Sequence, residues 1–273
     1  MVSIIIVSFN ARTDLARCLA SLHEPVPATP HEIIVVDNGS HDGSAETARR
    51  WADVHVIEAG GNLGFARGTN LGIRSSRGGL LLLLNSDTVV PPHAVDRLVE
   101  ELERDDRTSV VGPRLVDGAG RAELSFGKMI GPLNELRQKL LVLAHAARVP
   151  LLSGVVDRMT TRTRWTDWVS GACLLVRRGD AEAVGLLDER YFMYAEDVDF
   201  CAALRARGGR IRFAPTVTVV HARGRSAASA RAATASAYRR SQLAFYQKHH
   251  PRWAPLLRWY LRLRGQIISI PNP

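Results

Sequence analysis

EIIVVDNGSHDGS, at residues 32–44, is an unbroken apolar run that ends in a polar loop containing two glycines. Runs of this kind alternate with helical patterns through the first hundred residues. The runs lie at 2–8, 32–37, 54–57 and 80–84, and the helical patterns at 11–22, 44–51 and 65–76. Strands that alternate with helices form parallel sheets, and strands that are apolar at every position are covered on both faces. The sequence therefore predicts an α/β fold with a Rossmann-like, mostly parallel central sheet flanked by helices.

The second half of the chain continues this pattern and then becomes helical. We expect helices over 93–104, 132–148 and 196–207, strands over 109–116, 166–177, 210–213 and 216–221, a turn at 117–120 and a small-residue stretch at 222–237. Gly171 interrupts the strand at 166–177, and two helical patterns lie between the small-residue stretch and the C-terminus. The expected organisation is a domain over 1–225, with halves at 1–110 and 111–225, and a basic helical C-terminal extension over 226–273.

The length and composition are those of a folded protein without a membrane-spanning helix. A chain of 273 residues with 46% hydrophobic residues can bury a sizeable core. Its longest apolar run, Leu80 to Leu84, is far shorter than the about 20 residues that cross a bilayer. The N-terminus lacks the basic region and cleavage site of a signal peptide. Cys18, Cys173 and Cys201 are odd in number and widely spaced, which indicates a reducing cytoplasm and neither a disulfide framework nor a zinc site.

The net charge of +9 is unevenly distributed. Asp199 is the last acidic residue, and residues 200–273 contain 13 Arg and one Lys. This segment therefore carries +14, which leaves −5 for residues 1–199. An acidic body with a basic C-terminal region argues against a nucleic-acid binder and favours a localised polyanionic surface as a partner.

Polar side chains collect where each apolar run of the first half ends. They are Ser8 and Asn10, then Asp37 and Asn38, then Asn62, Gly64 and Arg67, and finally Asn85, Ser86 and Asp87. In open α/β sheets, ligands bind beyond the carboxyl ends of the strands. One such end is typical of a turn, but four in succession favour a site. The glycine-rich loop suits phosphate, although its spacing matches neither the G-x-G-x-x-G dinucleotide motif nor the P-loop.

Six stretches carry a resemblance to a known family. They are SIIIVSFN at 3–10, EIIVVDNGSHDGS at 32–44, GGNLGFARGTNLGI at 60–73, LLLLNSDTVV at 81–90, WVSGACLLVRR at 168–178 and GLLDERYFMYAEDVDFCAALRARG at 185–208. In this order they resemble the inverting glycosyltransferases of family 2, which have the GT-A fold, and in particular the bacterial rhamnosyltransferase-like members. The resemblance implies a nucleotide-sugar-binding half at 1–110 and an acceptor and catalytic half at 111–225.

The resemblance also implies roles for the polar strand ends. Asn85-Ser86-Asp87 stands where the family carries its D-x-D motif, so Asp87 would be the main carboxylate ligand of Mg²⁺ or Mn²⁺, and Asn85 a neutral ligand or a ribose contact. Asp37 corresponds to the residue that bonds the pyrimidine base. A carboxylate accepts the N3–H of uracil or thymine, which cytosine lacks, so a UDP- or dTDP-sugar is indicated. The remaining expected donor contacts are Ser8, Asn10, Asn38, Asn62, Gly64, Arg67 and Ser86.

Glu196 and Asp197 open the predicted helix at 196–207. Acidic residues in a first helical turn commonly do no more than interact with the helix dipole. The resemblance instead makes this pair catalytic, with Asp197 as the general base that takes the proton of an acceptor hydroxyl and Glu196 positioning acceptor or donor. Asp199 is the competing base and a candidate acceptor contact, because residues i and i+2 face different sides of a helix.

Further candidates lie on and after the last predicted strands. Trp168 and Gly171 would form part of the sugar and acceptor wall, although Trp168 could equally be a core aromatic. His221 is expected as a metal ligand or diphosphate contact, against the alternative of a surface or capping histidine. Arg223 and Arg225, in a segment rich in small residues, would close over the diphosphate.

The C-terminal segment 252–268 predicts a basic amphipathic helix. One helical stripe contains Trp253, Leu256, Leu257, Tyr260 and Ile267. Arginines on a helix with Trp, Tyr and Leu are typical of an interfacial membrane helix. The alternative is a helix docked on the domain with a solvated basic face.

These features together predict an inverting, metal-dependent glycosyltransferase. It would move a hexose or deoxyhexose, such as rhamnose, from a UDP- or dTDP-sugar to a lipid-linked or cell-surface polysaccharide acceptor. We expect a cytoplasmic protein, peripheral on the cytoplasmic face of the membrane, with no nucleic-acid partner. Because Asn85 replaces an acidic residue, the alternative is a nucleotide-sugar-binding partner or scaffold with little transferase activity.

Overall fold

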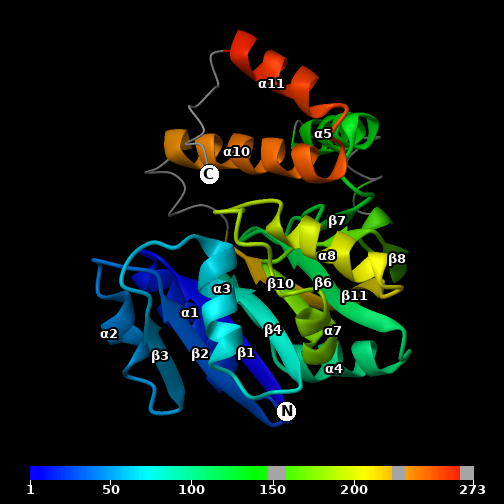
Figure 1. Ribbon diagram of the computed structural model, residues 1–273. Helices are drawn as coiled ribbons and strands as arrows, with labels where there is room; N and C mark the ends of the chain where they lie inside the picture. The colour runs from blue at the N-terminus through cyan, green and yellow to red at the C-terminus, as the bar shows by residue number, and fades with distance from the viewer. Residues whose placement is uncertain (147–155, 157, 223–230, 265–273) are drawn as a thin grey trace.

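A mostly parallel sheet forms the centre of the computed structural model, which describes residues 1–146, 156, 158–222 and 231–264 (Figure 1). Within these residues nine strands join the sheet in the order β3-β2-β1-β4-β10-β6-β11-β5, with β8 also paired to β11. Their bounds are β1 Val2–Ser8, β2 His31–Asp37, β3 Val54–Glu58, β4 Leu80–Asn85, β5 Thr88–Val89, β6 Thr108–Val116, β8 Arg164–Thr166, β10 Cys173–Arg177 and β11 Arg210–His221. β5, β8 and β10 pair antiparallel with their neighbours, and the others pair in parallel.

The strands of the first half are buried on both faces, as their continuous apolar runs predict. In β1, Ile4 and Ile6 belong to one buried cluster with side chains of α1 (Arg12–His23) and α4 (Ala94–Glu103). Ile5, on the opposite face, belongs to a second cluster with α3 (Phe65–Arg74). Helices therefore cover both sides of the sheet, and a short helix, α2 (Ser44–Ala48), lies beside β3 (Figure 1).

The second half adds helices to the α3 face of the sheet, and one of its strands is longer than predicted. α7 (Arg178–Ala183) and α8 (Glu196–Ala206) contribute to the same buried cluster as α3. The prediction of separate strands at 210–213 and 216–221 is wrong, because β11 is one strand with a register shift between Ala214 and Thr218. Pro215 lies in this shift, where its missing N–H removes one ladder hydrogen bond without ending the strand.

Gly171 separates two strands, as expected. Before it, β9 (Trp168–Val169) pairs with β7 (Phe126–Gly127) in a small second sheet, and after it β10 joins the main sheet.

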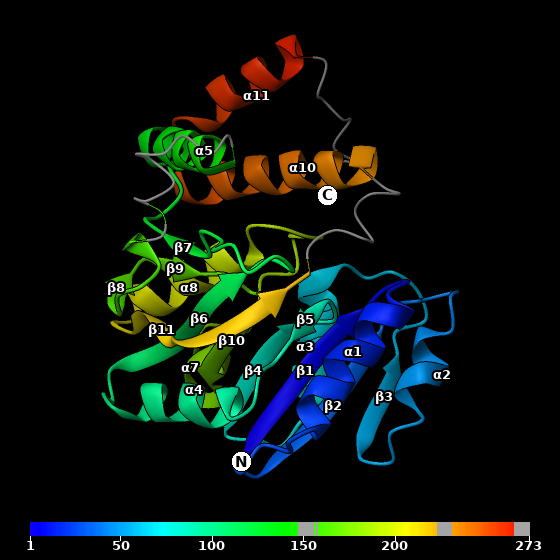
Figure 2. The same cartoon turned by 180° about the vertical axis from the view of Figure 1, so that it is seen from behind.

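Three further helices lie together over the end of the sheet at which β1 and β4 terminate (Figures 1 and 2). They are α5 (Pro132–Ala146), α10 (Arg231–His249) and α11 (Ala254–Leu263). The small-residue stretch predicted at 222–237 is helical from Arg231 onward, because alanine favours the helical conformation most. Phe245 and Tyr246 of α10 belong to the same buried cluster as α8, so this helix packs on the sheet domain.

α11 leaves most of its predicted apolar stripe exposed. Its buried positions are Ala254 and Leu261, with Leu257 partly buried, whereas Leu256 and Tyr260 are exposed. Ile267 lies outside the described residues. The helix is therefore docked through one face and still exposes large apolar side chains on another.

Two expectations about the whole chain can be compared with the structure. The three cysteines are free and buried. In the part of the chain that the structure describes, no helix combines the length and apolar character needed to cross a bilayer.

Candidate active site

Three adjacent strands bring the predicted donor residues to one edge of the sheet. Ser8 is paired with Asp37 across β1 and β2, and Val7 is paired with Asn85 across β1 and β4. Parallel strands end at the same edge, and their register is fixed by which side chains face the buried clusters. The structure therefore places Ser8, Asp37 and Asn85 side by side at the carboxyl end of the sheet.

Ser8 and Asp37 present buried polar atoms that lack partners. Ser8 Oγ and Asp37 Oδ1 are buried and have no hydrogen-bond partner among the residues the structure describes, whereas Asp37 Oδ2 accepts the Ser40 backbone N–H at 3.0 Å. A buried polar atom without a partner costs about 1–3 kcal/mol. These two atoms are therefore suited to a polar ligand that brings its own donor, as a uracil or thymine ring does.

Asn38 and Asn62 shape the glycine-rich loop. The Asn38 side-chain amide donates to Asn62 Oδ1 at 3.0 Å and to the Gly64 carbonyl at 3.2 Å, and its oxygen accepts the Leu63 backbone N–H at 2.9 Å. Gly64 has φ +84°, and a Cβ there would lie 2.3 Å from the Phe192 carbonyl oxygen. Only glycine fits at this position, so these residues fix the loop that leads into α3.

Asn10 and Arg67 have protein partners of different strength. Asn10 Oδ1 accepts the His41 backbone N–H at 2.8 Å, which links the ends of β1 and β2. Arg67 lies 3.6 Å from the Glu189 carboxylate, and both side chains are exposed. An exposed pair of this kind contributes at most about 1 kcal/mol, so Arg67 can exchange Glu189 for a phosphate at little cost.

His221, at the end of β11, meets the Asn85-Ser86-Asp87 segment. Its Nε2 lies 3.3 Å from Asp87 Oδ1 and 3.4 Å from Asn85 Nδ2. Its Nδ1 lies 3.2 Å from Glu123 Oε2, a residue that the sequence did not point to. Burial lowers the pKa of His221, but hydrogen bonds to the Asp87 and Glu123 carboxylates outweigh it and raise the pKa to about 9.

This arrangement fits a hard divalent cation. A carboxylate and an amide, each within 3.4 Å of the same imidazole, supply the oxygen and nitrogen ligands that Mn²⁺ or Mg²⁺ accepts. A carboxylate behind the imidazole, as Glu123 is here, orients a ligating histidine. No three His, Cys, Asp or Glu side chains gather as a metal cluster within the described ranges, and position 85 is an amide.

Ser86 is half-buried between its neighbours, and Arg223 and Arg225 lie outside the described residues.

Asp197 lies close to the strand that carries Asn85. Its Oδ2 accepts the Gly171 backbone N–H at 2.9 Å, and a Cβ at Gly171 would lie only 3.2 Å from Asp197 Cβ. The next residue, Ala172, accepts the Asn85 backbone N–H at 2.9 Å. Residues 171–172 therefore bridge Asp197 and Asn85, which brings the proposed base and metal ligands to one site.

The residues before the acidic pair adopt a constrained backbone. Tyr194 and Ala195 have φ +71° and +65°, the left-handed region that non-glycine residues rarely occupy. Phe192 anchors this segment, because its carbonyl accepts the Phe65 backbone N–H at the start of α3, at 2.7 Å. Backbone strain of this kind persists only where surrounding contacts impose it, and it commonly marks functional sites.

Glu196 and Asp197 differ in how their negative charges are stabilised. Burial raises the pKa of Asp197, although the Gly171 and Val198 backbone N–H groups stabilise its anion. Burial and repulsion from Asp197 raise the pKa of Glu196 well above its usual range, and Glu196 Oε2 is buried without a partner in the described chain. We expect Asp197 to ionise first and Glu196 to keep its proton, the separation that assigns a base and a neutral neighbour.

Asp199 lies in a different network. Its carboxylate accepts hydrogen bonds from Tyr191 Oη at 3.2 Å, Lys248 Nζ at 2.8 Å and His249 Nε2 at 2.6 Å. Lys248 also contacts Asp188 at 2.8 Å. The side chain of Asp199 is buried and ties α8 to the C-terminal helix α10, so its oxygens are already occupied by protein donors.

Trp168 lies in the hydrophobic core beside the acidic pair's helix. It is only 8% exposed, and its indole N–H donates to the Lys128 carbonyl at 3.0 Å. The side chain therefore supports the strand that leads to Gly171.

We expect Glu196→Gln to stabilise the protein increasingly as pH rises. A carboxyl whose folded pKa is raised favours folding below its unfolded pKa of about 4.3, and this contribution is lost as pH increases toward the folded value. A glutamine carries no charge, so the free energy of unfolding of the variant should exceed that of the wild type by about 1–3 kcal/mol at the highest pH. This is the scale of the cost of an unpartnered buried group. Melting temperatures from pH 5 to 8 measure the difference.

Glu103→Gln is the matched control, because Glu103 is exposed on α4. A difference in melting temperature between Glu196→Gln and wild type that stays constant across this pH range would contradict the raised pKa of Glu196.

Comparisons with known proteins agree with this geometry. Residues 3–156 match the family described as "Glycosyl transferase family 2", and residues 80–265 match "Glycosyl transferase family group 2". The chain is 30% identical to the N-acetylglucosaminyl-diphospho-decaprenol L-rhamnosyltransferase of Mycobacterium tuberculosis, with 95% of this chain and 88% of that protein covered. It is 24% identical to the rhamnosyltransferase WbbL of Escherichia coli, with 81% and 83% covered.

A solved structure supports the fold. The mannosyltransferase PcManGT from Pyrobaculum calidifontis, determined in complex with GDP-Man and Mn²⁺, superimposes with a TM-score of 0.61 at 18% identity, covering 94% of this chain and 68% of that one.

The chain has a GT-A-like fold with a helical C-terminal part. The chain belongs to glycosyl transferase family 2, and within it the chain is rhamnosyltransferase-like.

Proposed function

We propose that the protein is an inverting, metal-dependent glycosyltransferase that moves rhamnose or a similar hexose from a dTDP- or UDP-sugar to a hydroxyl of a lipid-linked acceptor. The observation that carries this proposal is the bridge at residues 171–172, which holds the half-buried Asp197 beside the Asn85 strand end. A base next to a diphosphate-binding edge is what transfer from a nucleotide sugar requires.

The donor side of the reaction uses the sheet edge. Asp37 accepts a proton donor of the base, next to Ser8, and the oxygen of the carboxylate that lacks a partner is the one available for it. Asp87, His221 and Asn85 would hold Mg²⁺ or Mn²⁺, which supplies charge stabilisation for the departing diphosphate. Glu123 keeps the His221 ring oriented through Nδ1.

The acceptor side uses Asp197. Its ionised carboxylate accepts the hydroxyl proton as the acceptor oxygen bonds to the anomeric carbon, while the bond from that carbon to the diphosphate oxygen breaks and its electrons stay on the diphosphate. Displacement from the opposite face inverts the anomeric centre. The Gly171 N–H holds the carboxylate in place, and protonated Glu196 beside it adds no second negative charge.

The test is transfer itself. dTDP-rhamnose, UDP-sugars and GDP-mannose are offered with Mn²⁺ and N-acetylglucosaminyl-diphospho-decaprenol, the acceptor in the name of the mycobacterial relative. We expect rhamnosyl transfer with an inverted product, read by mass spectrometry and NMR. Saturable donor binding without transfer to any acceptor would instead favour the binding-partner alternative.

We also propose that α5 and α11 contact the cytoplasmic face of a membrane. Of the fifteen large apolar side chains exposed in the described residues, nine lie on α5 or on α11 and its N-terminal cap. They are Leu133, Leu136, Leu140, Leu143, Trp253, Leu256, Trp259, Tyr260 and Leu263. Both helices lie at the sheet end that carries the site (Figures 1 and 2), so a lipid-linked acceptor would approach from this side.

The membrane contact predicts binding to lipid vesicles. The full chain should float with vesicles of phosphatidylcholine and phosphatidylglycerol, and removal of residues 251–273 should weaken this, because α11 supplies apolar area and positive charge. Val26→Gln, a change at an exposed apolar residue in the loop between α1 and β2, is the control and should float as wild type does. Equal flotation of the full and shortened chains would contradict the proposal.

A further inference from the structure

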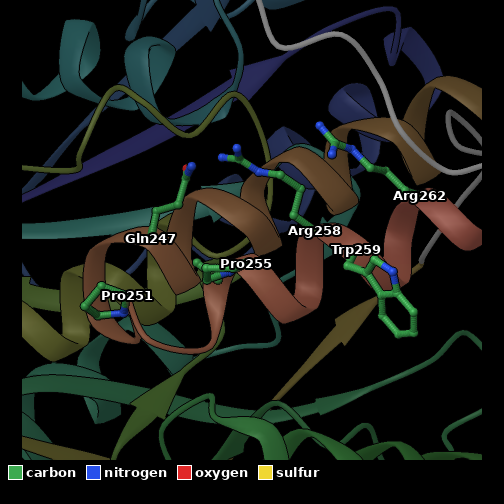
Figure 3. Close-up of a pocket in the computed structure, with 7 residues that line it drawn as sticks. Gln247, Pro251, Pro255, Arg258, Trp259 and Arg262 are labelled. Atoms are coloured by element: carbon green, nitrogen blue, oxygen red, sulfur yellow. The ribbon is translucent and has the colours of Figure 1, made fainter.

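A hollow of about 340 Å³ lies between α10 and α11. It is lined by Gln247, Pro251, Ala254, Pro255, Arg258, Trp259 and Arg262. Figure 3 shows the side chains of Arg258 and Arg262 extending to the same side of α11, and Trp259 extending the other way. None of these residues belongs to the candidate donor site or to the candidate base, so the hollow is separate from the candidate active site.

The two arginines in this hollow have no acidic partner. They lie one helical turn apart, where like charges repel each other. No ion pair to either guanidinium exists among the described residues, and the sequence contains no Asp or Glu after Asp199. Arg258 Nε is buried and also lacks a hydrogen-bond partner in the ranges described. An anion in the hollow would remove both costs, because guanidinium groups bind phosphate oxygens through paired N–H donors.

The surroundings of the hollow indicate which anion is involved. Exposed Trp259, Leu256 and Leu263 flank the arginines on the same helix, at 58%, 53% and 66% exposure. A free phosphate in water gains nothing from these apolar neighbours, whereas a phospholipid places acyl chains directly beside its phosphate. Trp and Arg side chains together are typical of protein surfaces that lie at the lipid headgroup boundary.

We infer that Arg258 and Arg262 bind the phosphate of an anionic lipid headgroup, with Gln247 of α10 as a further donor at the rim. This inference rests on the proposed membrane contact and makes it specific. Two arginines in one hollow can bind a single phosphate together, whereas dispersed positive charge only attracts the protein to an anionic surface. The occupied hollow fixes α11 against α10 and orients the sheet end with its site toward the bilayer.

The test compares two double variants of equal charge. Arg258→Gln/Arg262→Gln removes the hollow's arginines, and Arg252→Gln/Arg264→Gln removes two exposed arginines that flank the same helix and do not line the hollow. Binding to phosphatidylcholine vesicles with and without phosphatidylglycerol is measured at physiological salt. Dispersed charge accounts for about fivefold in affinity per arginine near the surface. We expect the hollow variant to lose at least tenfold more affinity for the anionic vesicles than the control variant.

Each other outcome is decisive. Equal losses in the two variants would show that only dispersed charge acts, and would overturn the headgroup site while leaving the membrane contact standing. Failure of the wild type to bind any vesicle would overturn the membrane contact as well. Saturable calorimetric binding of inorganic phosphate alone, lost in the hollow variant, would identify a free-anion site and overturn the lipid assignment. Transfer activity enters none of these readouts, so the result is independent of the proposed reaction.

Discussion

Asp197→Asn is expected to lower kcat by about 10²- to 10⁴-fold, the contribution of a general base, while the KM for the donor changes little. Asparagine keeps the shape of the side chain and can keep the Gly171 N–H contact through its carbonyl oxygen, but it cannot take the acceptor proton. Initial rates at saturating donor and acceptor measure the change.

The same assignment sets the pH dependence of the wild type. Burial raises the pKa of Asp197, and the base works only when ionised. Activity should therefore be present above the raised pKa and fall as pH is lowered through it, in a profile that Asp197→Asn lacks. The comparison variant is Asp199→Asn, two residues along the same helix. If kcat falls in Asp199→Asn while Asp197→Asn remains fully active, the general base is Asp199 and not Asp197.

Asp87→Asn is expected to lower kcat/KM by about 10²- to 10³-fold, because several kcal/mol of charge stabilisation on the diphosphate depend on the cation and each 1.36 kcal/mol is tenfold in rate. Asp87 is the carboxylate of the Asn85, Asp87 and His221 set, so no other acidic side chain of that set can replace it. EDTA should abolish wild-type activity and Mn²⁺ should restore it, while the variant should need a higher Mn²⁺ concentration for its residual rate.

Asp106→Asn is the control for charge alone, because Asp106 is an exposed carboxylate after α4. A wild type that is fully active in EDTA would exclude Asp87 as a ligand of an essential metal. Calorimetric titration of Mn²⁺ into the wild type and Asp87→Asn separates metal affinity from turnover.

The sheet edge could be predicted because local pattern and register suffice there. Apolar runs such as 32–37 end in polar residues, and parallel pairing then brings Ser8, Asp37 and Asn85 together whatever the rest of the chain does. The direction of β10 could not be predicted, since an apolar strand between β4 and β6 has the same sequence pattern whether it runs parallel or antiparallel.

The residues that support the site were harder to find, because their partners are distant in sequence. Glu123 follows a turn and reaches His221 only through the pairing of β6 with β11. Lys248 meets Asp188 and Asp199 only after α10 folds across α8. One sequence signal existed for Lys248: it is the only lysine among fourteen basic residues after Asp199, which suggests a compact ammonium group was needed there.

The contact between Asp199 and α10 has a consequence for biosynthesis. Asp199 gains two of its three side-chain partners only when Lys248 and His249, about fifty residues later, pack against it. While the ribosome is still adding α10, the first turn of α8, with Glu196, Asp197 and Asp199, lacks these partners. The first turn of α8, with the proposed base Asp197, therefore reaches its final contacts only late in translation.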